Sequence, residues 1–263
     1  MAKQFIYQDP NLPDVTLTDG YLSSASAFTS SGTITNESRC IDQSIGSSST
    51  WADTSSYGFN CALRFDFGSA VSIGAFALHT LDDISALAHI DLAYSSSPAS
   101  GYTGLVTNTA LTQRDDGWYV KTASAQSARY WIAVLYDTLT FADVSVQEII
   151  LGNVYSFDLG YDLNNVKSEI FGNSVVESYG GITYSNKRHD PKTQWEWNWS
   201  NIGSSMSTSL EGVRDDAAGD FSKFLFYDET TYNWGRMSAD SLQMTEIAWN
   251  RYSTKFQFTE ELE

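Results

Sequence analysis

This sequence has little of what most often identifies a chemistry. It contains two cysteines and four prolines in 263 residues, and no apolar run approaches the roughly 18 residues that a membrane helix needs. Cys40 and Cys61 stand alone, without the spacing of a metal site, so we expect two reduced thiols in or near a core. The N-terminus has no apolar stretch of the signal-peptide kind, which predicts a protein made in a cytoplasm.

Positive charge is also scarce. Fifteen lysines and arginines stand against 32 aspartates and glutamates, which gives a formal net charge of -17. The acidic residues are spread along the chain rather than gathered in a tail, so the surface should repel phosphate groups. We therefore expect no nucleic-acid partner and no insertion into a membrane.

Catalytic and cofactor motifs are missing as well. The chain has no phosphate-binding glycine loop, no dinucleotide fingerprint, no H-E-x-x-H pair and no G-x-S-x-G elbow. The three histidines, His79, His89 and His189, are scattered. Neighbouring acids occur at turns, where solvated carboxylates are common. We expect no catalytic residue and no cofactor, while the sequence leaves a structural metal undecided.

Short strands with polar turns dominate the first 152 residues. The runs have aromatic and β-branched residues, alternate in polarity or are apolar throughout, and are separated by loops rich in Ser, Gly and Asn. The expected strands are Leu63 to Phe67, Val71 to Leu78, Ile90 to Tyr94, Trp118 to Lys121 and Arg129 to Tyr136. This pattern predicts a mainly β domain, a sandwich or a jelly roll.

The second part of the chain is also mainly β, with one helix. Residues Thr193 to Trp199 alternate strictly, so three tryptophans share one face of a strand, as a thick core or a subunit contact requires. Residues Ser204 to Asp216 carry apolar side chains at helical spacing. Further strands are expected at Val175 to Ser178, Ile182 to Ser185, Phe221 to Tyr227, Ser241 to Trp249 and Ser253 to Thr259.

The order of features in the first part resembles the discoidin or galactose-binding-like jelly roll. The matching pieces are a polar Ala-Ser segment near residue 25, the run Leu63 to Gly68 and the closing run Arg129 to Val134. The resemblance implies a jelly-roll domain over residues 1–152 whose loops bind sugars, or whose loop aromatics plug the sandwich or face other subunits. The glycan-binding candidates are Trp51, Tyr57, Tyr102 and Trp118.

The whole chain resembles structural proteins of bacteriophage tails, of the distal-tail or tail-tip type. The junction Ala128 to Asp162 and the order of hairpin, basic loop, tryptophan strand and helix carry this resemblance. It implies a ring-forming domain over residues 153–263, a homo-oligomer with other tail proteins as partners, and a place in a virion tail. The contact candidates are Lys187, Arg188, Trp195, Trp197 and Trp199.

Two other functions stay open at this point. The chain can be a carbohydrate-binding module, or a glycan hydrolase associated with a baseplate or fibre. In the tail protein itself, the jelly roll would project outward and contact host surface glycan or neighbouring tail proteins. A hydrolase would need two facing carboxylates, which the sequence does not place.

Overall fold

A computed structural model gives the fold of two compact units, residues 6–155 and residues 1–5 with 156–262. We call them the first and the second unit. The predicted boundary was 152/153, and the first five residues join the second unit. The described residues are 3–8, 12, 15–19, 32–53, 59–84, 89–98, 101–106, 116–137, 143–157, 166–177, 179, 183–187, 190–217, 222–228 and 230–261. Among the helices they form, none is long and apolar enough to span a membrane.

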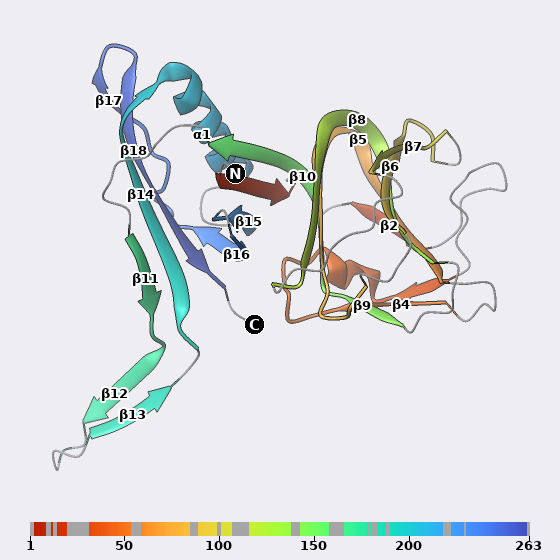
Figure 1. Cartoon of the computed structure of the whole chain (residues 1–263), viewed down its shortest axis with the longest axis horizontal. Helices are drawn as coiled ribbons and strands as arrows, with labels where there is room; N and C mark the ends of the chain where they lie inside the picture. Colours follow the sequence, from red (N-terminus) through yellow and green to blue (C-terminus); the bar gives the residue numbers. More distant parts are fainter. Residues whose placement is uncertain are drawn as a thin grey trace. The chain divides into compact units, whose positions relative to one another are not determined.

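The first unit is a β-sandwich, which confirms the predicted fold class. One sheet has the order β10-β5-β8-β6-β7, with β2 also paired to β5, and a second sheet has the order β3-β4-β9 (Figure 1). The strands are β2 Thr16–Asp19, β3 Thr33–Thr35, β4 Ser49–Ala52, β5 Asn60–His79, β6 His89–Ser95, β7 Thr103–Val106, β8 Trp118–Tyr136, β9 Val144–Val146 and β10 Glu148–Phe157. A short 3-10 helix, Glu37–Cys40, precedes β4.

Two long strands, β5 and β8, organise this unit. Each merges two runs that the sequence predicted as separate strands. Their pairing is interrupted between Asp66 and Val71, where Gly68 takes a φ of 72° that other residues rarely adopt. Arg129 reaches across this irregularity and holds both carboxylate oxygens of Asp66, with Nε to Oδ1 at 2.7 Å. The strands therefore continue through the glycine instead of ending there.

The core of the first unit lies between its two sheets. Alternate residues of β5, such as Leu63 and Phe65, point inward and meet Trp131 of β8, while Trp51 comes from the opposite sheet. Cys40 and Cys61 are also buried in this unit, and no disulfide joins them. The predicted position of both thiols in the core is confirmed.

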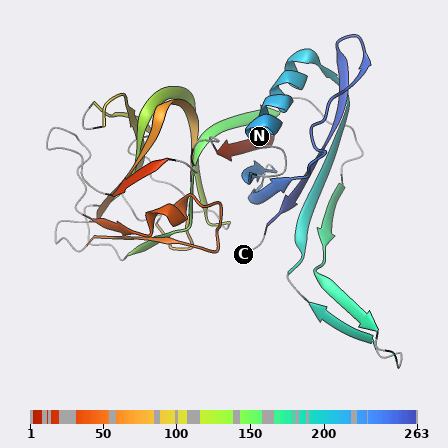
Figure 2. The same cartoon turned by 180° about the vertical axis from the view of Figure 1, so that it is seen from behind.

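The second unit is built on the strand order β11-β14-β18-β16-β15-β1, with β17 also paired to β18. Its strands are β1 Lys3–Gln8 (shared with the first unit), β11 Val166–Ile170, β12 Asn173–Glu177, β13 Thr183–Lys187, β14 Lys192–Gly203, β15 Phe224–Tyr227, β16 Tyr232–Met237, β17 Thr245–Ala248 and β18 Arg251–Glu260. The helix α1, Ser204–Asp216, follows β14 directly and has the predicted bounds. Strands β12 and β13 form a separate hairpin that continues beyond β11 and β14 in both views (Figures 1 and 2).

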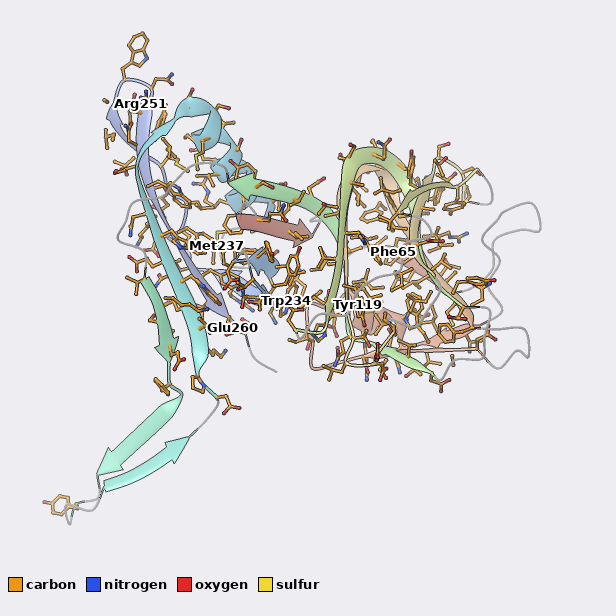
Figure 3. The ribbon with its side chains drawn as sticks, viewed as in Figure 1. Phe65, Tyr119, Trp234, Met237, Arg251 and Glu260 are labelled. Carbon is orange, nitrogen blue, oxygen red and sulfur yellow. The ribbon has the colours of Figure 1, made fainter. Side chains whose placement is uncertain are left out.

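An aromatic core stabilises the second unit. Trp195 and Trp197 of β14 stand directly opposite Phe258 and Phe256 of β18, and the rings of Trp197 and Phe256 stack with centroids 5.2 Å apart. Phe5 of β1 packs on Phe224 and Phe226 of β15. Cross-strand aromatic pairs of this kind are among the strongest contacts within a sheet. Figure 3 labels Trp234 and Met237 in the same core and Arg251 at the far tip of the unit.

Candidate functional site

The predicted glycan-binding tryptophans lie inside the first unit. Trp51 occupies β4, where Ser49 and Trp51 alternate inward, and its indole Nε1 donates a hydrogen bond to Ser49 Oγ at 3.0 Å. Trp118 begins β8 and packs on His79 with ring centroids 4.8 Å apart. Both are buried, so neither offers a face on which a sugar could stack. The alternative that these aromatics plug the sandwich fits their positions, and Tyr57 lies outside the described residues.

Tyr102 is the one predicted glycan-binding residue with a described, partly exposed side chain. It packs on the outer face of the sheet, and its hydroxyl donates to the carbonyl of Pro98 at 3.4 Å. Arg64 donates to the same carbonyl and to Thr18 Oγ1, each at 3.1 Å. Burial raises the pKa of Tyr102 to about 12, so its hydroxyl stays a hydrogen-bond donor at neutral pH. This Arg64–Tyr102 cluster brings an aromatic ring and a fixed guanidinium together.

The predicted contact tryptophans, Trp195, Trp197 and Trp199, lie in the interior of the second unit. Of the two roles left open for them, a thick core or a subunit contact, the packing described above supports the core. The indoles of Trp195 and Trp197 contact phenylalanines of the same chain, and all three tryptophans are buried, so they do not form a surface for another subunit. Lys187 ends β13, but its side chain and the whole of Arg188 lie outside the described residues.

The second unit instead exposes a different set of apolar side chains. All five residues of β11 are exposed, with Val166 at 52% and the following Phe171 at 60% exposure. Strand β17 is also exposed along its length, including Ile247, and Trp249 in the turn after it is 90% exposed. Val166 and Ile247 lie on strands β11 and β17, and Phe171 and Trp249 lie just after them; each of these strands pairs with one neighbour in the described strand order. Exposed apolar groups on strand edges are typical of interaction surfaces.

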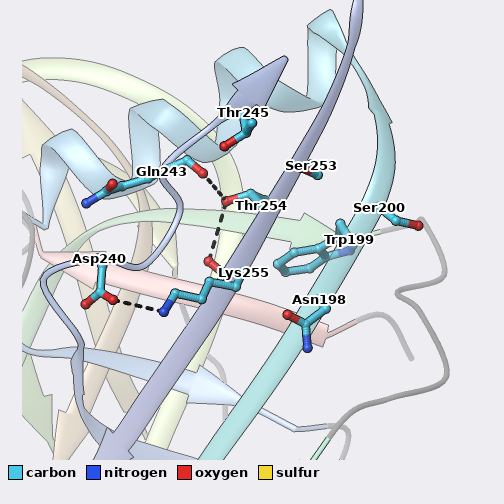
Figure 4. Close-up of a pocket in the computed structure, with 9 residues that line it drawn as sticks. All are labelled: Asn198, Trp199, Ser200, Asp240, Gln243, Thr245, Ser253, Thr254 and Lys255. Carbon is cyan, nitrogen blue, oxygen red and sulfur yellow. Dashed lines mark hydrogen bonds and ion pairs between the residues drawn. The ribbon is translucent and has the colours of Figure 1, made fainter. Parts of the chain in front are cut away.

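A polar cavity of about 500 Å³ lies beside β18 in the second unit. Figure 4 shows Asp240 and Gln243 on one side of this strand and the β14 residues Asn198, Trp199 and Ser200 on the other. Its lining residues are mostly polar and come from three parts of the chain: Asn198, Trp199, Ser200, Asp240, Gln243, Thr245, Ser253, Thr254 and Lys255.

The charged pair of this cavity is suited to binding rather than to proton transfer. Lys255 Nζ lies 2.9 Å from Asp240 Oδ2. The hydrogen bond from Lys255 lowers the pKa of the Asp240 carboxyl, and the same bond raises the pKa of Lys255. Both groups therefore stay charged near neutral pH, whereas a general acid or base works best with a pKa near the working pH. The described residues also hold no group of three or more metal-ligating side chains.

Sequence reasoning missed most of the cavity and the exposed edge. Asn198 was placed correctly on the face of β14 opposite the tryptophans, since strict alternation sets that face. Asp240 and Lys255 are separated by 15 positions, and only the fold of the loop before β17 brings them together. Strand β11 carried no prediction, because its alternation of Val166, Lys167 and Ser168 is too short to distinguish a strand from a loop.

Comparisons with known proteins give similar structures but no family. No family model matches the chain, and no curated protein does. A chitosan-binding module of a chitosanase/glucanase from Paenibacillus sp. IK-5 is 19% identical, with a TM-score of 0.39, and covers 56% of this chain and 100% of its own. A Clostridium perfringens module, CpGH89CBM32-5, solved with GalNAc-β-1,3-galactose, is 11% identical, also with a TM-score of 0.39, and covers 56% of this chain and 99% of its own.

A Ruminococcus gnavus GH29 fucosidase is 11% identical, with a TM-score of 0.40. It covers 57% of this chain and 27% of its own length, so the similar part is a minor portion of that enzyme. Carbohydrate-binding modules thus recur among the similar structures, and glycosidases occur among them as well. At these TM-scores the likeness carries no argument about function, and none of the three is a tail protein.

Proposed function

We propose that this chain is a non-enzymatic, self-associating structural protein whose second unit makes the contacts between copies. The exposed edge strand β11, with its apolar side chains Val166 and Ile170, carries this proposal. Val166, Ser168 and Ile170 share one face of the strand, and Phe171 follows them directly. An edge strand offers unpaired N–H and C=O groups to another strand, and apolar side chains around it add burial to that contact.

The charged side chains of β11 occupy one face of the strand. Lysine on an edge strand usually discourages addition of another strand. Here Lys167 is engaged within the unit, with its Nζ 5.0 Å from the centre of the Trp195 ring and 3.7 Å from Asp228 Oδ2. The opposite face of β11 keeps Val166 and Ile170 exposed, so a partner strand would cover apolar surface there.

The second exposed edge, β17, suggests how copies are arranged. It carries Ile247 and leads into Trp249, and it differs in sequence and surroundings from β11. Contact between two different edges is head to tail, which builds a closed ring or an open filament. This arrangement agrees with the ring that the resemblance to tail proteins implies, and a virion tail is the setting we propose, with other tail proteins as further partners.

Sedimentation of single-site variants at micromolar concentration tests the proposal. Ile170→Lys places a charge in the proposed contact, so we expect wild-type oligomers to become monomers. Leu81→Lys is the matched control, because Leu81 is a 66% exposed apolar residue of the first unit. A monomeric wild-type protein, or oligomers that survive Ile170→Lys, would contradict self-association through β11.

Carbohydrate binding by the first unit is a second candidate function, and the Arg64–Tyr102 cluster favours it. Sugar sites combine an aromatic face with a few fixed polar groups. Arg64 is fixed by Pro98 and Thr18, and its Nε is buried without a hydrogen-bond partner in the described residues. The modules from Paenibacillus and Clostridium perfringens are named for, or were solved with, carbohydrate, and we extend that ligand class to this unit as a proposal.

Glycan-array binding of the whole chain tests this second candidate. Tyr102→Ala should abolish binding to any glycan that the wild-type protein retains, while sedimentation stays unchanged. If Tyr102→Ala binds the glycan as well as the wild-type protein does, the Arg64–Tyr102 cluster is not the binding site.

A further inference from the structure

The polar cavity of the second unit shares Thr245 with the proposed contact strand β17, its other lining residues lie outside β11 and β17, and nothing yet assigns it a ligand. We infer that it binds a neutral saccharide of one or two sugar rings. A volume of about 500 Å³ falls within the range of roughly 300–1,000 Å³ found for small-ligand sites. The inference rests on the side chains that line this space.

Two side-chain amides of the lining supply unused hydrogen-bonding groups. Asn198 and Gln243 lie on opposite sides of β18, and neither amide makes a hydrogen bond within the described part of the chain. Thr245 and Ser253 add hydroxyl groups around the same space. Each amide both donates and accepts, as each sugar hydroxyl does, so this set matches a polyhydroxylated ligand better than an apolar one.

The walls of the cavity are held in place before any ligand arrives. Leu242 N donates to the carbonyl of Lys255 at 2.7 Å, and Ser238 N donates to the carbonyl of Gln257 at 2.9 Å. Thr254 Oγ1, which is buried, donates to the carbonyl of Gln243 at 2.9 Å. The loop before β17 is therefore tied to β18 on both sides of Asp240. A preformed site loses little conformational entropy when a small ligand binds.

The charges of the cavity select against an ionic ligand. The ion pair between Asp240 and Lys255 leaves the lining without net charge. A carboxylate sugar would have to compete with Asp240 for Lys255, and an ammonium sugar would have to compete with Lys255 for Asp240. Neutral hydroxyl groups can instead accept from Lys255 and donate to Asp240 while the pair stays intact.

Saturation-transfer NMR on the whole chain tests the inference, with lactose, cellobiose, maltose and N,N′-diacetylchitobiose as probes at millimolar concentration. We expect at least one disaccharide to bind. The double variant Asn198→Ala/Gln243→Ala should weaken that binding about tenfold or more, because two hydrogen bonds are lost. Gln194→Ala, on the same face of β14 but outside the cavity, is the matched control and should leave binding unchanged.

Chemical-shift mapping gives a readout that does not depend on a variant's ability to fold. A bound saccharide should shift the amide signals of residues 198–200, 240–245 and 253–255. The inference is overturned if none of the four disaccharides binds, or if binding survives the double variant. It is also overturned if Tyr102→Ala removes the binding, since the ligand then occupies the first unit.

Discussion

Each of the two units buries a hydrophobic core, but they differ in the apolar groups that they leave in contact with solvent. In the first unit, Leu81 is the one large exposed hydrophobic side chain among the described residues. The second unit exposes six, and all but Tyr179 lie on or directly beside the edge strands β11 and β17: Val166, Ile170, Phe171, Tyr179, Ile247 and Trp249. Single exposed hydrophobics are normal, whereas a gathering on strand edges indicates a surface that is covered in an assembly.

This contrast changes the roles expected of the tryptophans. The resemblance to a jelly roll made Trp51 a glycan-binding candidate in a loop, with a plug of the sandwich as the alternative. In the fold, Trp51 belongs to a strand in which Ser49 is itself buried and accepts the indole hydrogen bond. Trp249 is the tryptophan that faces solvent, and it sits in a hairpin turn where Asn250 has a φ of 59°.

The largest expected effect is the stability difference between these two tryptophans. Trp51→Ala removes a fully buried ring from the first unit, which should lower the free energy of unfolding by about 3–5 kcal/mol. Trp249→Ala removes an exposed ring and should change it by less than about 0.5 kcal/mol. Chemical denaturation of both variants at low protein concentration measures the difference. Equal losses would contradict the burial contrast.

A smaller effect concerns acid stability in the second unit. Burial alone would raise the pKa of the Glu261 carboxyl, but hydrogen bonds and charge from Lys223 and Arg236 outweigh it and hold the pKa below its usual range. A lowered folded-state pKa stabilises the protein above the unfolded pKa of about 4.3, and this stabilisation is lost as the pH falls through the lowered value. Melting temperatures measured from pH 6 down to about pH 3 should therefore fall less steeply for Glu261→Gln than for the wild-type protein.

That comparison fails if the two melting curves stay parallel over the whole pH range. In that case, Glu261 gains no net stabilisation from Lys223 and Arg236. Glu211→Gln on α1 removes one negative charge without touching Lys223 or Arg236, so the same series for this variant provides the control for the charge change itself.

The smallest expected effect is in the first unit. Arg129 holds Asp66 across the irregular region of β5 and β8, and its hydrogen bonds lower the pKa of Asp66. Both side chains are partly exposed, so solvent screens the pair, and Asp66→Asn should cost about 0–1 kcal/mol. Urea denaturation measures the loss in the free energy of unfolding. A loss of several kcal/mol would mean that β5 and β8 need the Asp66–Arg129 pair to stay paired on both sides of Gly68.

How much the sequence predicts depends on how local the signal is. Strand β14 and helix α1 follow from alternation and helical spacing, and both appear where expected. The continuation of β5 through Gly68 does not follow from the local sequence, because a glycine at this position suggests a turn. It can be predicted only once β8 is known to pair with β5 both before and after Gly68. The cavity and the exposed edge depend on which strands become neighbours, and that information lies in contacts between residues far apart in the chain.

Hydrogen exchange at two protein concentrations tests most directly whether copies of the chain associate through the second unit. On β11, amides that do not bond to β14 face outward and should exchange quickly in the monomer. When the concentration rises into the range of self-association, we predict slower exchange at residues 166–171 and unchanged exchange throughout the first unit. Identical exchange in β11 at both concentrations, or protection that appears in the first unit instead, would contradict the account.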